Sequence, residues 1–374
     1  MKMKLTMIFV IVSNLAFATD YYVSTSGSDS NAGTSTGAAW ATINHANSVV
    51  VPGDVVNVAA GSYSQNVSTT TSGTSGSPIT YISTSQFGAQ ITGTTDPTWN
   101  NTGSYVIIKN FDITSSVSTV NDGIETTGTY SQIIGNRVHD IQDSDHAGGG
   151  AIWVGAAHVT VDSNIIYNVG IGLMTALTHG VYVSATTYTL VENNLIIAVQ
   201  GGYGIQEYAN GAGYMTTVNN TIVASHGGIV LGSDNPSNPS DYNFIGNNII
   251  YSNTYNGGGY GILECCASGE VGSHQTYTNN LLYANTPSNL SLAYSGDSPV
   301  NEVTASPLFV NYTGAPTGNY QLQAGSPAIN AGTSINAPNY DIRGALRPQG
   351  SAYDIGAYEF DSPQAPKDLT AVVK

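Results

Sequence analysis

The chain has 374 residues, of which only 9% are charged, and its 24 acidic residues outnumber the eight basic ones. The formal net charge of −16 excludes nucleic acid as a plausible partner and repels an acidic polymer unless cations bridge the two. Low charge, 43 glycines and many β-branched residues favour an all-β, turn-rich chain over a helical one.

Residues 1–18 are predicted to form a signal peptide. Lys2 and Lys4 precede an apolar run, and Ala16-Phe17-Ala18 supplies the small residues that signal peptidase requires. We therefore expect secretion after cleavage near Ala18. No second apolar segment approaches the roughly 20 residues of a membrane span, so we expect a secreted monomer without a transmembrane helix.

A repeat dominates residues 104–293. Each copy contains an apolar strand, an asparagine, a second short strand, a variable loop, and a glycine or alanine followed by Ile or Val. The asparagines recur every 26–32 residues, at Asn110, Asn136, Asn164, Asn194, Asn220, Asn248 and Asn280. Three short strands per repeat predict a parallel β-solenoid, because each coil can stack on the previous one and the side-chain amides can hydrogen-bond along a column.

Both ends carry further motifs. The opening "YYVSTSGSDSNAGTSTGAAWATINHA" with "PGDVVNVAAGSYS" is similar to the first coil of many exported β-helix proteins, including family 9 polysaccharide lyases. The end, "GNYQLQAGSPAINAGT" through "DIRGALRPQGSAYDIGAYEF", resembles their closing segment. With the repeats, these motifs resemble the right-handed parallel β-helix proteins of the pectate-lyase-like superfamily. We predict a cap and first coils over 19–103, central coils over 104–293, a closing segment over 294–360 and a linker or tail over 361–374.

The resemblance implies where a substrate would bind. In that superfamily the outer face of the strand after the variable loop forms the groove, and in this chain that strand carries six aligned aliphatic residues: Ile124, Ile152, Val181, Ile205, Ile229 and Ile262. Because alternate side chains face opposite ways, their neighbours are predicted to face solvent: Glu125, Trp153, Tyr182, Gln206, Val230 and Leu263. We expect the preceding glycines to keep the groove floor low.

Aromatic and polar side chains on such a face suit sugars, since ring faces take C–H groups and amides take hydroxyls. We assign Trp153, Gln206, Tyr208 and His146 to substrate binding. Packing of the aromatic rings beneath a neighbouring loop is the alternative.

The loop "QDSDHAGGG" leads into the Trp153 strand. Asp143 and Asp145, with Glu125 nearby, are predicted to hold Ca²⁺ through oxygen ligands or to supply a carboxylate pair. An ordinary solvated turn is the strong alternative, because Asp and Gly are common turn residues.

His179 and Tyr182 are expected on one coil, where they would serve as base and acid in a β-elimination. A structural histidine is the alternative. None of the basic residues falls on the groove strand, so the lysine or arginine base that a family 9 lyase uses is missing. This argues against a close family 9 activity.

Two further features say less about function. Glu207 and Glu264 share the pattern Gly-Ile-x-Glu and are predicted to point inward, bonding turn amides at the strand ends. The adjacent Cys265 and Cys266 are predicted to be free thiols, one packed and one exposed, and a vicinal disulfide is the less favoured alternative.

The sequence therefore predicts a secreted, all-β parallel β-helix that acts on a polysaccharide. A lyase that cleaves an acidic polysaccharide leads, with Glu125, His179 and Tyr182 as catalytic residues. A glycoside hydrolase that uses paired carboxylates, and a non-catalytic glycan-binding surface or adhesion protein, stay open.

Overall fold

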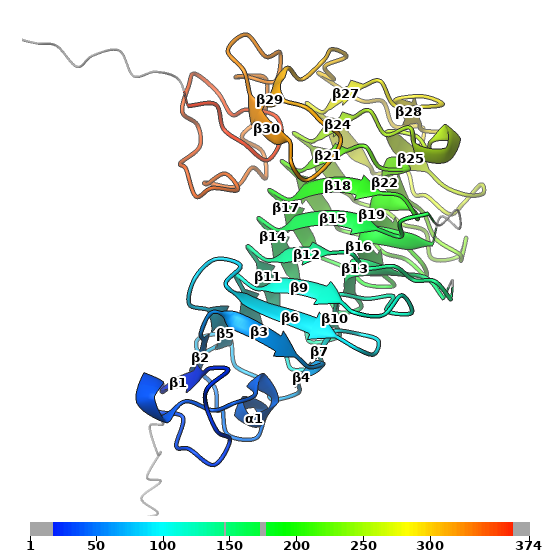
Figure 1. The fold of residues 1–374 in the computed structure, drawn as a ribbon. Coiled ribbons are helices and arrows are strands. Elements are labelled where there is room, and N and C mark those ends of the chain that lie inside the picture. Colours follow the sequence, from blue (N-terminus) through cyan, green and yellow to red (C-terminus); the bar gives the residue numbers. More distant parts are fainter. Residues whose placement is uncertain (1–17, 146, 173–176, 362–374) are drawn as a thin grey trace, which may run out of the picture.

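The structure is a computed structural model and describes residues 18–145, 147–172 and 177–361. Three parallel sheets form the walls of a right-handed β-solenoid of about eight turns, which confirms the predicted fold (Figure 1). Among the residues that the structure describes, helix is confined to α1 (Ile43–Asn47) and two short 3-10 turns, Thr36–Ala38 and Tyr255–Gly257. Within the described ranges, no helix is long and apolar enough to cross a membrane.

Each coil contributes one strand to each sheet, and the sheets are named A, B and C in the order in which the chain visits them. Sheet A contains β1 (Asp20–Val23), β2 (Val55–Val58), β5 (Ile79–Ser83), β8 (Val106–Lys109), β11 (Gln132–Ile134), β14 (Thr160–Asp162), β17 (Leu190–Glu192), β20 (Thr216–Val218), β23 (Phe244–Gly246) and β26 (Thr276–Thr278). Sheet B contains β3 (Gly61–Ser64), β6 (Ala89–Gly93), β9 (Asp112–Ser115), β12 (Arg137–His139), β15 (Ile165–Val169), β18 (Leu195–Val199), β21 (Thr221–Val223), β24 (Ile249–Tyr251) and β27 (Leu281–Tyr283). Sheet C contains β4 (Val67–Thr69), β7 (Trp99–Asn101), β10 (Ile124–Thr126), β13 (Gly149–Val154), β16 (Thr178–Ser184), β19 (Tyr203–Tyr208), β22 (Gly227–Leu231), β25 (Ile262–Glu264) and β28 (Leu290–Ser291).

The predicted asparagine ladder runs along the corner between sheets A and B. The side-chain amide of Asn164 donates to Oδ1 of Asn194 at 3.0 Å, and Asn194 donates to Asn220 at 2.9 Å. The same contact continues in both directions, from Asn136 to Asn164, Asn220 to Asn248 and Asn248 to Asn280. These amides are buried and also bond the corner backbone, so each rung satisfies groups that water cannot reach.

Asn110 is an exception to the predicted ladder. The pairing of β8 with β11 places Ile108 beside Ile133 and Lys109 beside Ile134, so Asn110 continues this register opposite Gly135. Phe111 is therefore the residue in the ladder column, where its backbone N–H donates to Oδ1 of Asn136. Asn110 instead occupies the left-handed corner position (φ 66°), which also favours asparagine. The assignment of Asn110 to the ladder was wrong by one residue.

We expect Asn194→Ala to lower the free energy of unfolding by about 1–3 kcal/mol, because it leaves buried backbone and amide groups without partners. Thermal unfolding of the full chain measures this loss. Asn66, which is partly exposed in the first coils, provides the control: Asn66→Ala should cost less. Equal melting temperatures for Asn194→Ala and the wild type would contradict the structural role of the ladder.

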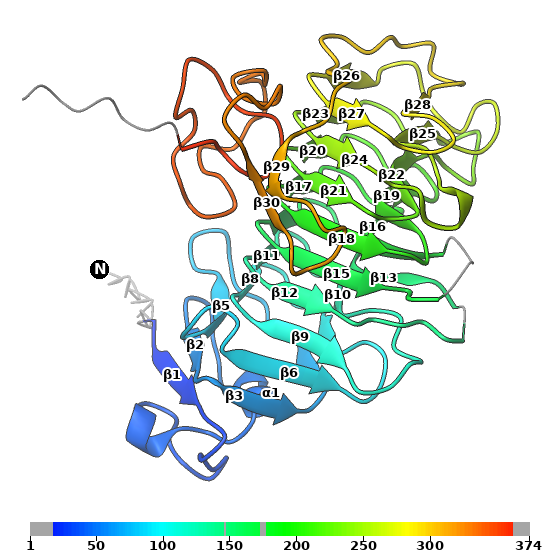
Figure 2. The same cartoon turned by 45° about the horizontal axis from the view of Figure 1, so that its top comes forward.

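The C-terminal segment (residues 303–360) folds back along the outside of the solenoid. Figure 2 shows it, with β29 (Phe309–Asn311) and β30 (Asn319–Leu322), beside the upper coils. Its apolar side chains form a second core against the outer face of sheet B, including Leu195, Val223 and Ile249. This part of sheet B is therefore closed to a ligand.

A second column of asparagines fixes this segment. Asn193, Asn219, Asn247 and Asn279 each precede a ladder asparagine, and each donates its side-chain amide to a backbone carbonyl of the segment. The three preceding coils with this corner have Asn110, Gly135 and Ser163 there. The doubled asparagines thus mark the coils whose corner side chains hydrogen-bond to the segment.

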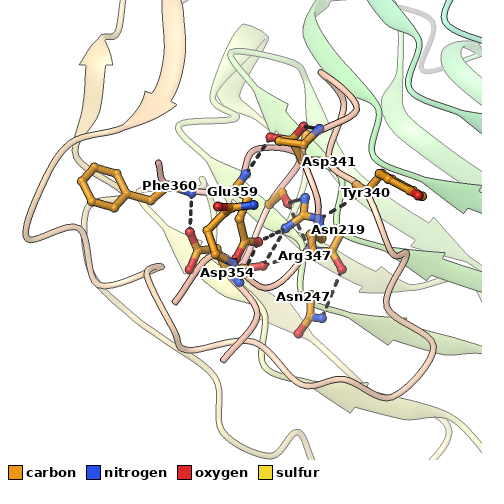
Figure 3. A network of polar contacts seen from close by, with 12 residues as sticks. Asn219, Asn247, Tyr340, Asp341, Arg347, Asp354, Glu359 and Phe360 are labelled. Carbon is orange, nitrogen blue, oxygen red and sulfur yellow. Dashed lines mark hydrogen bonds and ion pairs between the residues drawn. The ribbon is translucent and has the colours of Figure 1, made fainter. Parts of the chain in front are cut away.

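Arg347 joins the segment to this column, as Figure 3 shows. Its guanidinium donates to Oε2 of Glu359 at 2.7 Å, to the carbonyl of Gly356 at 2.8 Å and to Oδ1 of Asn193 at 3.2 Å. The side chains of Arg347 and Glu359 are both fully buried. The buried charges of Arg347 and Glu359 therefore compensate each other, and the bond from Arg347 to Asn193 ties the segment to the solenoid.

Candidate functional site

The outer face of sheet C carries the predicted column of side chains. Strand pairing places Glu125 beside Trp153, Trp153 beside Tyr182 and Tyr182 beside Gln206, on four successive coils. All four are partly exposed, whereas Val230 on the next coil is buried. The aligned aliphatic residues point into the solenoid and are fully buried, as predicted. Of the predicted column, the stretch from Glu125 to Gln206 is therefore open, and it continues on the preceding coil at Asn100, which pairs with Glu125 and is also partly exposed.

The glycines that directly precede the aligned aliphatic residues, such as Gly180 and Gly204, do not form the floor of the groove. A Cβ on Gly180 would lie 2.5 Å from the carbonyl oxygen of Gly204 and 2.9 Å from Cγ2 of Ile196, a buried residue of sheet B. A Cβ on Gly204 would meet Ile222, again from sheet B, at 2.4 Å. Glycine is needed here because the corner between sheets B and C is tightly packed, which corrects the role predicted from the sequence.

Trp153 lies flat along the strand. A Cβ on Gly155 would come within 2.3 Å of the indole, so the ring occupies the space above that glycine. Trp153 stays partly exposed and presents an apolar platform at the surface. This orientation is compatible with the stacking of a sugar ring on the indole, and the substrate-binding role of Trp153 stays a prediction.

Tyr208 forms a second platform on the same face. A Cβ on Gly232 would lie 3.1 Å from Cε2 of Tyr208, so the phenol ring extends over the next coil. One coil further, Cys265 and Cys266 are joined by a disulfide. The prediction of two free thiols was wrong, because adjacent cysteines close a small ring that spacing rules for longer loops do not cover.

Carboxyl groups collect at the start of β10. Burial raises the pKa of Asp122 well above its usual range; its hydrogen bond from the Gly150 N–H opposes this, and the charges of Asp96, Glu125 and Asp143 add to it. Burial, followed by the charge of Asp96, also raises the pKa of Glu125. Glu125 and Asp122 therefore hold a proton more readily than free carboxyls.

Asp96 and Asp122 were missed in the sequence. Asp96 lies in the loop of the preceding coil, and its Oδ1 accepts hydrogen bonds from the N–H groups of Asn121 and Asp122. The sequence did contain a signal for Asp122. This residue lies two positions before the inward Ile124, whose place in the repeat was predicted. Loop conformation, which no repeat encodes, brings Asp96 to the same place.

Asp143 stabilises its own loop through hydrogen bonds. Its buried carboxylate accepts hydrogen bonds from the N–H groups of Ala147 and Gly148 and from the hydroxyl of Thr178 at 2.5 Å. Asp145 is exposed, and His146 lies outside the described residues. No group of three or more His, Cys, Asp or Glu side chains in the described ranges is placed to hold a metal ion. The Ca²⁺ site at Asp143 and Asp145 stays a prediction.

His179 lies beneath the face rather than on it. It is 1% exposed, and its Nδ1 accepts a hydrogen bond from the backbone N–H of Tyr203. Burial, together with the charge of His226, lowers the pKa of His179 to about 3. Its ring centroid is 5.3 Å from that of Tyr182, which is partly exposed. The predicted role of His179 as a base is untested, and its burial disfavours it.

Glu207 and Glu264 point inward, as predicted. Glu264 accepts hydrogen bonds from the N–H groups of Tyr294 and Ser295 and from the hydroxyl of Tyr277. Glu207 bonds only the hydroxyl of Thr217, and burial raises its pKa to about 7. Neither carboxyl reaches the outer face of sheet C.

The described basic residues lie elsewhere. Lys109 belongs to sheet A, Arg343 and Arg347 belong to the C-terminal segment, and Arg137 on sheet B forms a bidentate pair with Asp112 at 2.8 and 2.7 Å. No described lysine or arginine belongs to sheet C. The carboxyl groups of this face therefore lack positive partners.

Asp112 also holds His139, and this pair gives a pH-dependent stability. Burial lowers the pKa of His139, but hydrogen bonds to Asp112 at 2.9 Å and Asp140 at 2.7 Å outweigh it, so the pKa is raised above 6.5. The stabilisation is present in full below about pH 6.5 and is lost as the pH rises through the raised pKa. Urea unfolding should therefore show a gap between wild type and His139→Asn that is widest near pH 6 and narrows above it. A gap of constant size from pH 5 to 9 would refute this.

Comparisons with known proteins agree with this architecture. Residues 79–249 match the family model described as the right handed beta helix region. Pectate lyase Pel9A is 17% identical with a TM-score of 0.56, over 92% of this chain and 97% of that chain. A rhamnogalacturonan lyase is 15% identical with a TM-score of 0.51 (79% and 91%), and XylC in complex with xylose is 12% identical with a TM-score of 0.50 (77% and 70%). No curated protein matches the sequence significantly. At these sequence identities, the similarity shows a shared fold alone.

Proposed function

From the right-handed parallel β-helix fold that this chain shares with pectate-lyase-like proteins, we propose that it is a polysaccharide-active enzyme. A polysaccharide chain binds along the outer face of sheet C and is cleaved beside Glu125. The observation that carries this proposal is the in-register column of Glu125, Trp153, Tyr182 and Gln206. At about 4.8 Å per coil, it presents a carboxyl group, two aromatic rings and an amide over roughly 14 Å.

We propose a role for each side chain of the column. Trp153 stacks on a sugar ring, while Gln206 and Tyr208 hydrogen-bond hydroxyl groups further along the face. Glu125, whose pKa is raised, donates a proton to the oxygen of the leaving sugar. Such a donor needs a pKa shifted toward the working pH.

We propose β-elimination as the reaction. A base removes the proton next to the uronate carboxyl group, the C–O bond to the leaving sugar breaks, and Glu125 protonates the departing oxygen. A double bond forms in the remaining sugar. Tyr182, a partly exposed group on the same face, takes the first proton in this scheme as its phenolate and becomes the neutral phenol. The pectate lyase and the rhamnogalacturonan lyase, which share the fold, support this choice.

An acidic polysaccharide adds negative charge to a face without basic residues, so we propose that Ca²⁺ bridges the polymer to the protein. Asp145, which is exposed, supplies a carboxylate of the type that Ca²⁺ prefers, and the uronate carboxylates of the polymer supply further oxygen ligands. Bound Ca²⁺ would neutralise substrate carboxylates. If this is correct, chelation weakens binding of polygalacturonate without shifting the unfolding temperature much.

Glycoside hydrolysis is the second candidate. The raised pKa values of Asp122 and Glu125 favour it, because glycosidases use a carboxylic acid that stays protonated near neutral pH. This reaction would suit a neutral polysaccharide, which the uncompensated carboxyl groups do not repel. We further propose that the chain acts outside the cell as a monomer, in line with its N-terminal motif.

The products distinguish the candidates. The full mature chain is incubated with acidic and neutral polysaccharides, with and without Ca²⁺, and both ultraviolet absorbance and reducing ends are followed. New ends with the absorbance of an unsaturated uronate indicate a lyase, and new ends without it indicate a hydrolase. Trp153→Ala should weaken binding, whereas Tyr283→Ala on sheet B should not. Binding without product would leave a non-catalytic glycan-binding or adhesion protein, and absence of both would overturn the proposal.

A further inference from the structure

The column on sheet C extends past Glu125 in the direction away from Trp153. Strand pairing places Asn100 beside Glu125 and Ser68 beside Asn100, each one coil closer to the N-terminus. Ser68 is exposed and Asn100 is partly exposed. Glu125 therefore lies within the column, with Trp153 on one side and Asn100 on the other, and not at its end.

Strand alternation fixes the face on which Asn100 lies. Its neighbours on β7, Trp99 and Asn101, are fully buried inside the solenoid, so Asn100 belongs to the outer face. Asn101 has a structural role, because its amide donates to the carbonyl of Gly103 at 3.0 Å and to the hydroxyl of Thr126 at 2.9 Å. The two adjacent asparagines therefore serve opposite sides of the same sheet.

The amide of Asn100 is left without a partner by the residues that the structure describes. No hydrogen bond to it occurs among them, and its Oδ1 is shielded from solvent. A buried acceptor without a donor costs free energy, and asparagine is disfavoured in the middle of a strand. Because the terminal torsion of asparagine is soft, the amide can turn toward a hydroxyl group that a ligand brings to the outer face.

Sheet B shows a contrast in the neighbouring strands of the same coils. There the outer polar side chains pair with one another: Asp112 accepts hydrogen bonds from Arg137 at 2.8 and 2.7 Å and bonds His139 at 2.9 Å. On sheet C, neither Asn100 nor Glu125 has a hydrogen-bond partner for its side chain within the described ranges. These two neighbouring polar groups are therefore available to a ligand.

We propose that Asn100 binds the polysaccharide on the opposite side of the cleavage point from Trp153, so that the polymer is cut at an internal bond. This inference rests on the function proposed for sheet C and adds the position of the cut. From Asn100 to Gln206 the column is roughly 19 Å long, at about 4.8 Å per coil. A polymer that contacts both Asn100 and Trp153 has sugars on both sides of Glu125. Removal of sugars from a chain end would need a face that closes beside Glu125, whereas Ser68 on the next coil but one is exposed.

The course of cleavage tests this inference. The full mature chain is incubated with polygalacturonate and Ca²⁺, or with galactomannan if it cleaves only a neutral polymer, and viscosity and new reducing ends are followed together. Internal cleavage should lower the viscosity steeply while few ends have formed, and the first products should cover a range of lengths. A single short product from the start, with slow loss of viscosity, would overturn the inference while the proposed function stands. If the wild type cleaves no polymer, the proposed function fails and this inference fails with it.

The contribution of Asn100 is located with an end-labelled oligogalacturonate of uniform length, or with the matching manno-oligosaccharide. Loss of a contact on one side of the cleavage point favours binding frames with more sugars on the other side. Asn100→Ala and Trp153→Ala should therefore shift the position of the cut in opposite directions. Asn100→Ala should also lower kcat/KM about three- to tenfold, as for the loss of one hydrogen bond. An unshifted cut, or a shift in the same direction as in Trp153→Ala, would overturn the role of Asn100.

Two other asparagines provide matched controls. Asn57 is partly exposed on β2 of sheet A, and Asn57→Ala should leave both the cut and kcat/KM unchanged. Asn101→Ala removes buried hydrogen bonds and should lower the melting temperature, whereas Asn100→Ala should not. Equal losses of melting temperature in Asn100→Ala and Asn101→Ala would mean that Asn100 stabilises the fold, and would contradict its assignment to the substrate.

Discussion

Glu125→Gln is expected to lower turnover by about 10²- to 10⁴-fold, the usual contribution of a positioned acid or base. Gln has the same shape and keeps a polar head beside Trp153, but it cannot give up a proton to a leaving oxygen. Binding of the polysaccharide should therefore change little. Turnover at saturating substrate and the dissociation constant, measured on the same preparation, separate the two effects.

Glu192 offers a matched control for this experiment. Burial, with the charge of Asp162, raises the pKa of Glu192 to about 7, yet this residue belongs to β17 on sheet A. Glu192→Gln should therefore retain the turnover of the wild type. If Glu125→Gln and Glu192→Gln lose turnover equally, or if neither does, the catalytic role of Glu125 is wrong.

Arg347→Ala should lower the free energy of unfolding by about 3–5 kcal/mol, because it leaves Glu359 buried without its charged partner. The carbonyl of Gly356 and Oδ1 of Asn193 would lose a donor as well. Urea unfolding measures the loss. The C-terminal segment, rather than the coils, should open first in hydrogen exchange, since Arg347 ties the segment to them.

Arg343 provides the comparison, since its side chain is 28% exposed and one of its two carboxylate partners, Asp361, is 65% exposed, although the other, Asp341, is buried. Arg343→Ala should cost less than Arg347→Ala, because water reaches Asp361 and backbone N–H groups still donate to Asp341. Replacing Arg347 and Glu359 together by Met and Leu should recover much of the loss. If the double replacement lowers the free energy of unfolding as much as Arg347→Ala alone, then lost packing and not the unpaired charge causes most of the destabilisation.

The register of the coils was predictable because it repeats. Strand alternation alone placed Glu125, Trp153, Tyr182 and Gln206 on one face, and backbone pairing confirms each pair. Asn110 was misplaced because asparagine suits two adjacent positions of the same corner, the left-handed residue and the ladder residue. Only pairing with the next coil distinguishes them.

Burial of two site residues was not predictable. The sequence placed Asp143 in a loop before a sheet C strand and His179 at the start of the next such strand, where exposure is the usual expectation. Both side chains are instead buried, since Asp143 bonds the Thr178 hydroxyl and the Tyr203 N–H donates to the ring of His179. Such contacts join different coils at the ends of the sheet C strands, and no periodic pattern contains them.

A readable signal was overlooked for the rings that stack face to face at the corner before sheet A: Tyr105, Tyr130, His158, Tyr188, Tyr214, Tyr242 and His274. Tyr or His stands just before each sheet A strand from β8 to β26, at intervals that follow the coils. The search for alternation inside strands passed over residues at the corners. Repeat proteins therefore deserve the same column-by-column comparison at their turns as in their strands.

The doubled asparagines limit how this chain can change in length. The segment is bound to consecutive corners at Asn193, Asn219, Asn247 and Asn279. A coil inserted between β20 and β23 would move two of these anchors about 4.8 Å away from the other two, and the segment would have to stretch or release one pair. A coil inserted between β5 and β8 would leave all four anchors in place. Gain or loss of coils during evolution, and in engineering, is therefore tolerated on the N-terminal side of Asn193.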